Sequence, residues 1–363
     1  GVILGAIAYL AVNIPVVVAA DVLPRFRLPS MSLMSSIVRD SIPRSLALGV
    51  GSVTALVLTA MASRIGTGSV SVFTFASNLE TVPLALIGSS YAVAAFPALS
   101  EASALEKKEE FTRILSASAR HIILWSIVSL GLIAVLRAHL VRVVLGTGAF
   151  DWNATRLTAA LLALLAVGLV AQGIVLLFSR ALYAARQSWR PLVYQILGGV
   201  LTVLLAMTFL AMPSDGLLAS LSSLLKVADI PGTEILLLAL AVTLGQVFLA
   251  LLSLLALRSV APGLGRMLTR SLADGFLAAV AGGVAAYAVL AFEGGIAPLT
   301  TLAAVFTQGL IAGIVGLAAA ACALFLVENE EFRIVTNALL RLIRSPEEQS
   351  TALPPSAEEP TQP

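Results

Sequence analysis

The sequence predicts an all-α membrane protein that crosses the bilayer several times, and three observations lead to this fold class. Apolar residues make up 59% of the 363 residues and charged residues only 12%, which is about half the charged share of a soluble domain. Apolar runs of about 20 residues recur along the whole chain, each long enough to cross a hydrocarbon core of roughly 30 Å. The runs are continuous and rich in Leu and Ala, as membrane helices are.

Nine spans are predicted, and their boundaries are approximate. They cover residues 1–20, 43–63, 69–98, 117–136, 155–183, 191–212, 235–257, 272–292 and 300–327. The third and fifth spans approach 30 residues, which exceeds a straight crossing at about 1.5 Å per residue. We therefore expect these two helices to tilt or bend, and Pro83 is the expected kink in the third.

The distribution of Lys and Arg predicts the orientation. Alternate connections hold 17 of the 22 basic residues, and the other connections hold 5. The richer set is Arg25, Arg27, Arg39, Arg44, Lys107, Lys108, Arg113, Arg120, Arg180, Arg186, Arg190, Arg258, Arg266, Arg270, Arg333, Arg341 and Arg344. Because basic loops stay in the cytoplasm, we expect the C-terminus inside and Gly1 outside. With no signal-peptide pattern at Gly1, we also expect an odd number of further helices upstream.

Residues 328–344 follow the last span and form a second kind of segment. Phe332, Val335, Leu339 and Leu342 share one helical side, whereas Arg333, Asn337, Arg341 and Arg344 share another. This pattern favours an amphipathic helix on the inner membrane face, and the alternative is a solvated continuation of the last span. The composition of residues 345–363 is typical of a disordered tail.

Polar side chains form a stripe on the third span. At 100° per residue, Asn78 shares one helical side with small and polar neighbours. These neighbours are Thr74, Thr81, Ala85, Gly88 and Ser89. Such a stripe serves either close helix packing with hydrogen bonds or the wall of a water-filled cavity, and the pattern alone leaves both open.

Glu80 lies off that stripe, on nearly the opposite side of the same helix. An ionised carboxylate in mid-membrane costs about 3 kcal/mol on insertion scales. Glu80 therefore needs a partner, a protonated state or a route to the surface, and Arg64 on the preceding loop is one possible partner.

The other polar residues within the spans favour structural roles. Interhelical hydrogen bonds are the preferred reading for each of them, and ligand contacts are the alternative. They are Gln172, Tyr194, Gln195, Gln246 and Gln308. The last two spans are apolar nearly all round, and their glycines, Gly282-Gly283 and the Gly309/Gly313 pair, predict close packing. Cys322, the single cysteine, is read as a packing residue.

Enzymatic constellations are missing from the sequence. It has no His/Cys/Asp cluster with metal-ligand spacing, no nucleotide-binding loop and no Ser/His/Asp set that could plausibly meet. We expect no enzyme activity, no cofactor, no metal site and no nucleic-acid partner. Of the remaining classes, many spans with a polar stripe and small loops favour a transporter or flippase over a membrane enzyme or a scaffold.

The segment FASNLETVPLALIGSSYAVAAFPALSEA, residues 75–102, resembles the eighth helix of the MurJ/MviN family of lipid II flippases in the MOP exporter superfamily. Further segments resemble the family in the expected order. They are IPRSLALGVGSVTALVLTAMAS (42–63), RAHLVRVVLGTGAFDW (137–152) and SRALYAARQSWRP (179–191). The resemblance covers about residues 40–210, and elsewhere only the number of helices supports it.

The resemblance implies a nine-helix portion of a MOP/MATE-like, two-lobed flippase, from about its sixth to its fourteenth helix. Residues 1–20 would be the last helix of an N-terminal lobe that this chain otherwise lacks. Residues 21–257 would form the C-terminal six-helix lobe, and residues 258–327 two additional helices with a groove for a lipid tail. The implied function is alternating-access flipping of lipid II, the peptidoglycan precursor on undecaprenyl pyrophosphate, across the bacterial inner membrane for cell-wall biogenesis.

The implied substrate cavity is lined by Thr74, Ser77, Asn78, Glu80 and Thr81. Arg44 and Arg180 would lie at its cytoplasmic mouth, where the alternative is that they only serve the positive-inside bias. Expected partners are lipid II or a related undecaprenyl-linked saccharide, membrane lipids and the N-terminal lobe.

The chain departs from the family pattern at several positions. Ser77-Asn78 stands where many members have Asp-Arg, and Leu58, Thr202 and Ala206 replace an acid and two amides that some members use for sodium. Sodium coupling is therefore not expected. The alternatives are an exporter of another polyprenyl-linked saccharide, or a flippase-like scaffold that transports nothing.

Overall fold

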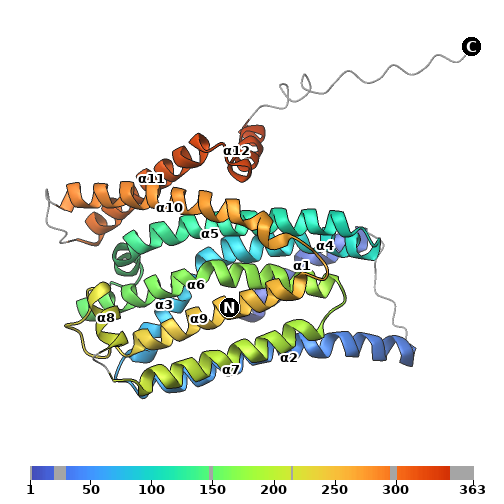
Figure 1. The fold of residues 1–363 in the computed structure, drawn as a ribbon, viewed down its shortest axis with the longest axis horizontal. Helices are drawn as coiled ribbons and strands as arrows, with labels where there is room; N and C mark the ends of the chain where they lie inside the picture. The colour runs from blue at the N-terminus through green and yellow to red at the C-terminus, as the bar shows by residue number, and fades with distance from the viewer. Residues whose placement is uncertain (1, 20–29, 147–149, 214–215, 295–300, 344–363) are drawn as a thin grey trace, which may run out of the picture. The chain divides into compact units, whose positions relative to one another are not determined.

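A computed structural model describes residues 2–19, 30–146, 150–213, 216–294 and 301–343. The chain divides into two units, residues 1–43 and 44–363, and the boundary falls at Pro43 within a helix. Figure 1 shows the helices with their labels. They are α1 (Val2–Ala19), α2 (Met31–Ala62), α3 (Ser69–Pro83), the π-helical turn η1 (Leu84–Ser89), α4 (Ser90–Ala104), α5 (Lys108–Leu145), α6 (Trp152–Ala184), α7 (Trp189–Ala211), α8 (Leu217–Leu224), α9 (Ile235–Leu257), α10 (Leu264–Gly294), α11 (Leu302–Leu326) and α12 (Glu330–Ile343).

The predicted fold class is confirmed. Within the described residues, eight helices are long and apolar enough to cross a membrane, and each coincides with a predicted span. The first predicted span, residues 1–20, corresponds to α1, whose apolar stretch Ile3–Ala19 is shorter than the other eight. The short helix α8 lies in a connection for which the sequence pattern predicted no element. The predicted tail, residues 345–363, lies outside the described residues, as does Gly1.

Helix α6 is the centre of the second unit. In its most apolar 18-residue window 72% of the residues are buried, against 17–50% in the other spanning helices. It packs against α3, α5 and α9, and Leu161, Leu165 and Leu169 on it are fully buried. Asp151 starts the helix, because its Oδ1 accepts a hydrogen bond from the Ala154 backbone N–H at 2.7 Å and so satisfies a donor that the first turn leaves unpaired. An apolar sequence on all sides thus forms the helix that other helices surround.

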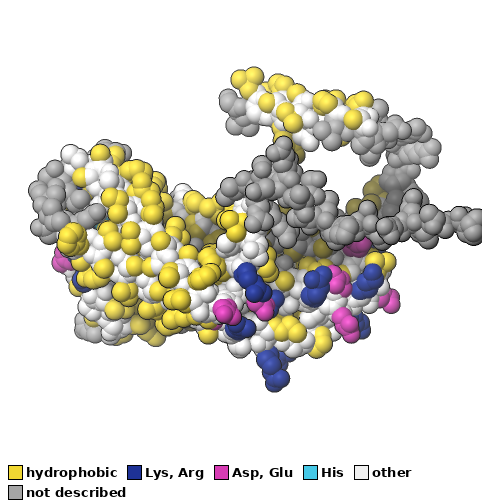
Figure 2. All heavy atoms as spheres, turned by 90° about the horizontal axis from the view of Figure 1, so that it is seen from above, with side chains coloured by type: hydrophobic (Ala, Val, Ile, Leu, Met, Phe, Trp, Pro, Cys, Tyr) yellow, Lys and Arg dark blue, Asp and Glu magenta, His cyan; other side chains and the backbone are white. Residues whose placement is uncertain are grey.

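The connections gather at two opposite ends, as the distribution of basic residues predicts. At one end the α4–α5, α6–α7 and α9–α10 connections line a common pocket that includes Lys107, Gln187 and Ser259. At the other, the guanidinium of Arg156 hydrogen-bonds the Asp229 carboxylate at 2.7 Å and thereby lowers the pKa of Asp229. Figure 2 shows most charged side chains on the drawn face gathered towards one end, while hydrophobic side chains cover much of the rest. Which end faces the cytoplasm stays a prediction.

The third predicted span is one long helix, Ser69–Ala104, interrupted by a wide turn. Pro83 has no N–H to donate, and the π-helical turn η1 follows it directly. The Ser90 hydroxyl donates to the carbonyl of Ala85, five residues earlier, at 3.0 Å. At this turn a Cβ on Gly88 would lie 2.8 Å from the Cα of Gly173 on α6. The expected irregularity at Pro83 is therefore present as a widened turn, held against α6 by two glycines.

Helices α10 and α11 pack against each other and against α5. A Cβ on Gly282 of α10 would lie 2.8 Å from the backbone oxygen of Gly316 on α11. Gly309 lies close to His139 of α5, where a Cβ would be 3.1 Å from that of the histidine. Small residues let the three backbones approach closely, so the packing role predicted for Gly282 and Gly309 is confirmed.

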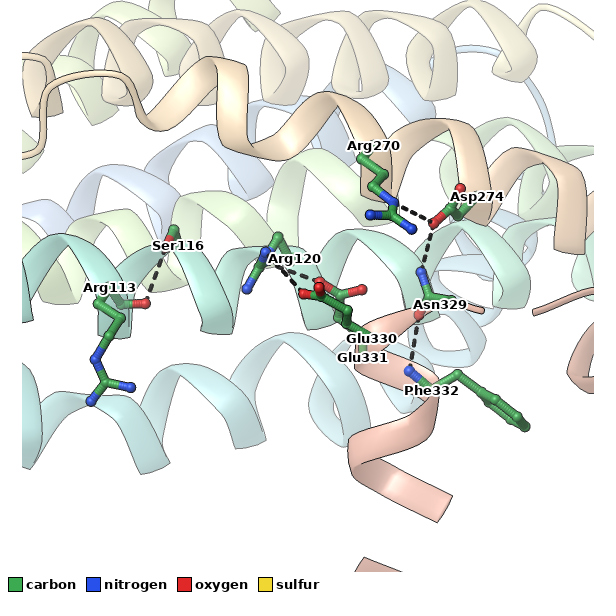
Figure 3. A network of polar contacts seen from close by, with 9 residues as sticks. All are labelled: Arg113, Ser116, Arg120, Arg270, Asp274, Asn329, Glu330, Glu331 and Phe332. Atoms are coloured by element: carbon green, nitrogen blue, oxygen red, sulfur yellow. Dashed lines mark hydrogen bonds and ion pairs between the residues drawn. The ribbon is translucent and has the colours of Figure 1, made fainter. Parts of the chain in front are cut away.

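A polar network attaches the start of α12 to α5 and α10 (Figure 3). Asn329 donates from Nδ2 to Asp274 of α10 at 2.8 Å, and its Oδ1 accepts the Phe332 backbone N–H at 2.9 Å. Glu331 forms an ion pair of 3.0 Å with Arg120 of α5. Asn329 and Glu331 are buried, at 2% and 5% exposed. Within the predicted segment 328–344, Glu330–Ile343 is thus a helix that starts at a buried polar junction, and its placement on the membrane face stays a prediction.

Substituting Gly88 by Ala tests the contact at η1. The added Cβ would meet the Gly173 backbone at 2.8 Å, so α3–α4 must move away from α6. Overpacking of this kind costs about 1–3 kcal/mol. We expect Gly88→Ala to lower the thermal unfolding midpoint of the purified full-length protein in detergent.

Gly313→Ala is the matched control, because a Cβ there meets the Leu136 side chain at an ordinary 3.5 Å. An equal loss of stability in both variants would show that the helix-to-helix contact is not the cause.

Candidate functional site

A polar pocket lies inside the second unit, where α2, α3, α6, α7 and α9 meet. Its volume is about 270 Å³. The polar residues that line it are Thr54, Ser77, Glu80, Thr81, Gln172, Gln195, Thr202 and Gln246. Glycines of α7 and α9 bring the helices close together at this level: a Cβ on Gly245 would overlap the Thr202 hydroxyl of the neighbouring helix. The chain therefore places several polar side chains together within otherwise apolar helices.

Glu80 is the ionisable residue that lines this pocket, and it is only 6% exposed. Gln172 of α6 donates from Nε2 to Glu80 Oε1 at 2.5 Å. The partner is thus Gln172 and not Arg64, which was the possibility raised from the sequence. The predicted interhelical role of Gln172 is confirmed, as is that of Gln308, which hydrogen-bonds His139 at 3.0 Å.

The other hydroxyls of the pocket are tied to their own helices. Ser77 donates to the Phe73 carbonyl and Thr81 to the Ser77 carbonyl, both at 2.9 Å. Thr202 donates to the Gly198 carbonyl at 2.8 Å. Since each hydroxyl has one proton, their oxygen lone pairs remain to accept hydrogen bonds from the pocket.

The structure divides the predicted site residues into two groups. Ser77, Glu80 and Thr81 line the pocket together. Thr74 and Asn78 do not line it, and both are exposed on α3. Exposed polar side chains in the middle of an apolar helix need water or a further protein surface beside them. Their face of α3 is thus a second polar surface, which adjoins the pocket at Thr81, a pocket residue that is itself exposed.

Arg44 and Arg180 lie in the same region of the second unit. The Arg44 guanidinium lies 4.7 Å from the ring centroid of Tyr183 and 5.9 Å from that of Phe96. Arg180 donates from Nη1 to the Ser89 backbone carbonyl at 3.2 Å, at the end of η1. Across the described part of the chain, neither arginine is in an ion pair. Both positive charges remain available to an anion.

Sequence reasoning had assigned two of the pocket residues elsewhere. The sequence favoured interhelical hydrogen bonds for Gln195 and Gln246, with ligand contacts as the alternative, and both line the pocket. Thr202 was noted only as a departure from a family pattern, yet it is a buried part of the pocket wall. The available signal was the coincidence of glycines with these residues, Gly198-Gly199 next to Gln195 and Gly245 next to Gln246. In the described ranges no group of three or more His, Cys, Asp or Glu is placed to hold a metal ion.

Spanning helices that enclose a polar pocket and carry a second polar face define a multi-pass membrane protein with a polar site within its helices. The family model described as "Lipid II flippase MurJ" matches residues 1–305, so the chain belongs to the MurJ family. Members of this family are flippases, which is consistent with the expectation that the chain is not an enzyme. The family and the apolar helices together make it a multi-pass protein of the bacterial inner membrane.

Two similar proteins agree with this family. A lipid II flippase MurJ of Burkholderia cenocepacia is 25% identical over 220 residues, which are 59% of this chain and 42% of that protein. A solved structure titled "Lipid II flippase MurJ, inward closed conformation" matches with a TM-score of 0.60 at 16% identity, over 84% of this chain and 58% of that one. At that identity the match shows the fold. The chain spans less than half the length of the Burkholderia relative.

A double-mutant cycle tests the hydrogen bond between Glu80 and Gln172. Gln172→Leu leaves a buried carboxyl without its donor, which costs about 1–3 kcal/mol, whereas replacing both partners by apolar groups can be nearly neutral. We expect Gln172→Leu to lower the unfolding midpoint of the full-length protein and Glu80→Leu/Gln172→Leu to restore much of it. Additive losses in the cycle would contradict the contact.

Proposed function

We propose that the chain is the C-terminal part of a lipid II flippase that works by alternating access. The observation that carries this proposal is the match of the MurJ family model over residues 1–305. The similarity to the solved MurJ fold supports it. The relatives share only 16–25% identity with the chain. The lipid-linked substrate is therefore proposed from membership of the family.

The second unit provides the proposed C-terminal lobe. Its buried clusters join α3, α5, α6 and α9 into one packed body. A body packed in this way moves as a unit, as alternating access by rocking lobes requires. The exposed face of α3 with Thr74 and Asn78 would form one wall of the substrate cavity, and the N-terminal lobe would form the other.

The substrate carries a pyrophosphate, so its entry needs positive charge that is not neutralised by the protein. Arg44 and Arg180 meet this requirement, because no carboxylate in the described residues pairs with either. Aromatic rings beside Arg44 orient its guanidinium without removing its charge. We place these arginines at the predicted cytoplasmic mouth of the cavity. Asn78 would donate a hydrogen bond to the head group deeper in.

Helices α10 and α11 would hold the lipid tail. Several large apolar side chains on them are exposed, among them Phe276, Tyr287 and Phe306. Their polar content is low, and the close contact of Gly282 with Gly316 keeps the pair together. This surface suits an isoprenoid chain and offers no aqueous path.

Substituting Asn78 by Leu tests the assignment of the cavity wall. The exchange removes a hydrogen-bond donor from an exposed position and should not disturb the packed body. We expect the full-length protein with Asn78→Leu to lose complementation of cells depleted of their own lipid II flippase. Thr208→Leu is the control, because Thr208 is likewise an exposed polar residue, on α7. Full rescue by Asn78→Leu at normal expression would contradict the assignment.

Substitution of Arg180 by Ala tests whether this residue binds the substrate head group or only contributes to the distribution of positive charge that sets the topology. Charge-assisted hydrogen bonds contribute about 1.5–3 kcal/mol, so Arg180→Ala should weaken head-group capture by about tenfold or more. Flipping of labelled lipid II in proteoliposomes gives the measurement. Arg180→Lys, which keeps the charge, should retain part of the activity.

Arg266→Ala removes another basic residue of the same predicted side, one that is exposed on α10. It should leave flipping unchanged. If Arg266→Ala and Arg180→Ala reduced flipping equally, Arg180 would serve only the distribution of positive charge.

A further inference from the structure

Glu80 is a buried carboxyl deep within a spanning helix. It is eleven residues into the helix that begins at Ser69, which places it roughly 17 Å along the helix axis. At that depth an ionised carboxylate is costly unless a cation, water or several donors compensate it. Its state therefore depends on what faces it.

Among the residues that the structure describes, no cation pairs with Glu80 or lines its pocket. The described ion pairs do not include it, and it is the sole titratable residue among those that line the pocket. Helix α9 contains no titratable residue at all. On the remaining helices of the second unit around Glu80, the titratable residues lie elsewhere. They are Arg44 on α2; Tyr91 and Glu101 on α4; Lys108, Glu109, Glu110, Arg113, Arg120, His121, Arg137, His139 and Arg142 on α5; Arg156, Arg180 and Tyr183 on α6; and Arg190 and Tyr194 on α7.

The partner that Glu80 does have suits both of its protonation states. The amide of Gln172 donates from Nε2 to the carboxyl oxygen, as an ionised carboxylate requires. After rotation of the same amide, its oxygen accepts the hydrogen of a neutral carboxylic acid. An arginine or lysine in this place would hold the carboxyl permanently ionised. Gln172 thus permits a proton to bind and to leave.

The pocket offers a path for that proton. Its volume of about 270 Å³ has room for water molecules, which occupy about 30 Å³ each in the liquid. The hydroxyl protons of Ser77, Thr81 and Thr202 are committed to backbone carbonyls, so their oxygens face the pocket as acceptors. Acceptors suit the O–H of a carboxylic acid and the hydrogens of water.

We propose that Glu80, with Gln172 and the hydroxyls around the pocket, forms a reversible proton-binding site inside the lobe. The proton passes from pocket water to a carboxyl oxygen of Glu80 and returns by the same route. The neutral form is compatible with a dry pocket, whereas the ionised form draws water between α2 and α7 on one side and α3 and α6 on the other. The site belongs to the lobe itself, and its proton binding does not require that lipid II be the substrate.

Infrared difference spectroscopy of the full-length protein in lipid vesicles tests the proposal. We expect a carbonyl band of a protonated carboxylic acid at neutral pH, where exposed carboxyls are ionised. The band should disappear reversibly as the pH is raised, and Glu80→Gln should lack it with a loss of one carboxyl equivalent. Glu101→Gln, which removes an exposed carboxyl from α4, should leave the band unchanged.

A second variant keeps the test decisive if Glu80→Gln does not fold. Gln172→Ala removes the hydrogen bond to the carboxyl and should shift the frequency of the same band. If the wild-type protein shows no such band, or keeps it in Glu80→Gln, the proposal is overturned. It is also overturned if Na⁺ added at constant pH abolishes the band, because the site then binds a metal cation in preference to a proton. Lipid flipping is measured separately, so failure of either proposal leaves the other standing.

Discussion

The structure depends on one constraint: hydrocarbon provides no hydrogen-bond partner, so the chain must satisfy its own polar groups. Hydroxyl side chains do this locally, as when Thr59 donates to the carbonyl of Ala55 four residues before it. Side chains too long for that reach a neighbouring helix, and Gln172 with Glu80 is the clearest case. Thr243 is a hydroxyl residue that bonds across helices instead, because it donates from α9 to the Leu164 carbonyl of α6. Polar residues therefore fix which helices touch and at which level.

Much of the fold could be predicted from the sequence because each span carries its own signal. Length and hydropathy identify a membrane helix without reference to its neighbours, and so the predicted ranges coincide with the observed helices. The stripe drawn on the third span was less accurate beyond Pro83. It placed Gly88 on the same side as Asn78, whereas Gly88 is buried against α6 and Asn78 is exposed. The widened turn η1 breaks the constant rotation of 100° per residue on which the projection relies.

The candidate site was predictable only in part, for a related reason. Ser77, Glu80 and Thr81 were singled out by residue type, but the residues opposite them depend on how closely the helices approach. Gly199 and Gly245 permit that approach because they lack a side chain. A Cβ added at either position would lie within 2.6 Å or less of a threonine hydroxyl on the neighbouring helix. Pairwise packing across helices far apart in sequence has no periodic signature. Packing between α3 and α6 makes Gln172, and not Arg64, the partner of Glu80, and the sequence pattern does not show this packing.

The junction before α12 has a consequence for how the chain leaves the bundle. One side chain, Asn329, both caps α12 and reaches the buried carboxylate of Asp274 on α10. The direction of α12 after the last membrane helix is thus fixed by the contact of Asn329 with Asp274 on α10. A force applied to α12 would therefore be transmitted to α10 and α5 through these contacts, and not to α11 alone.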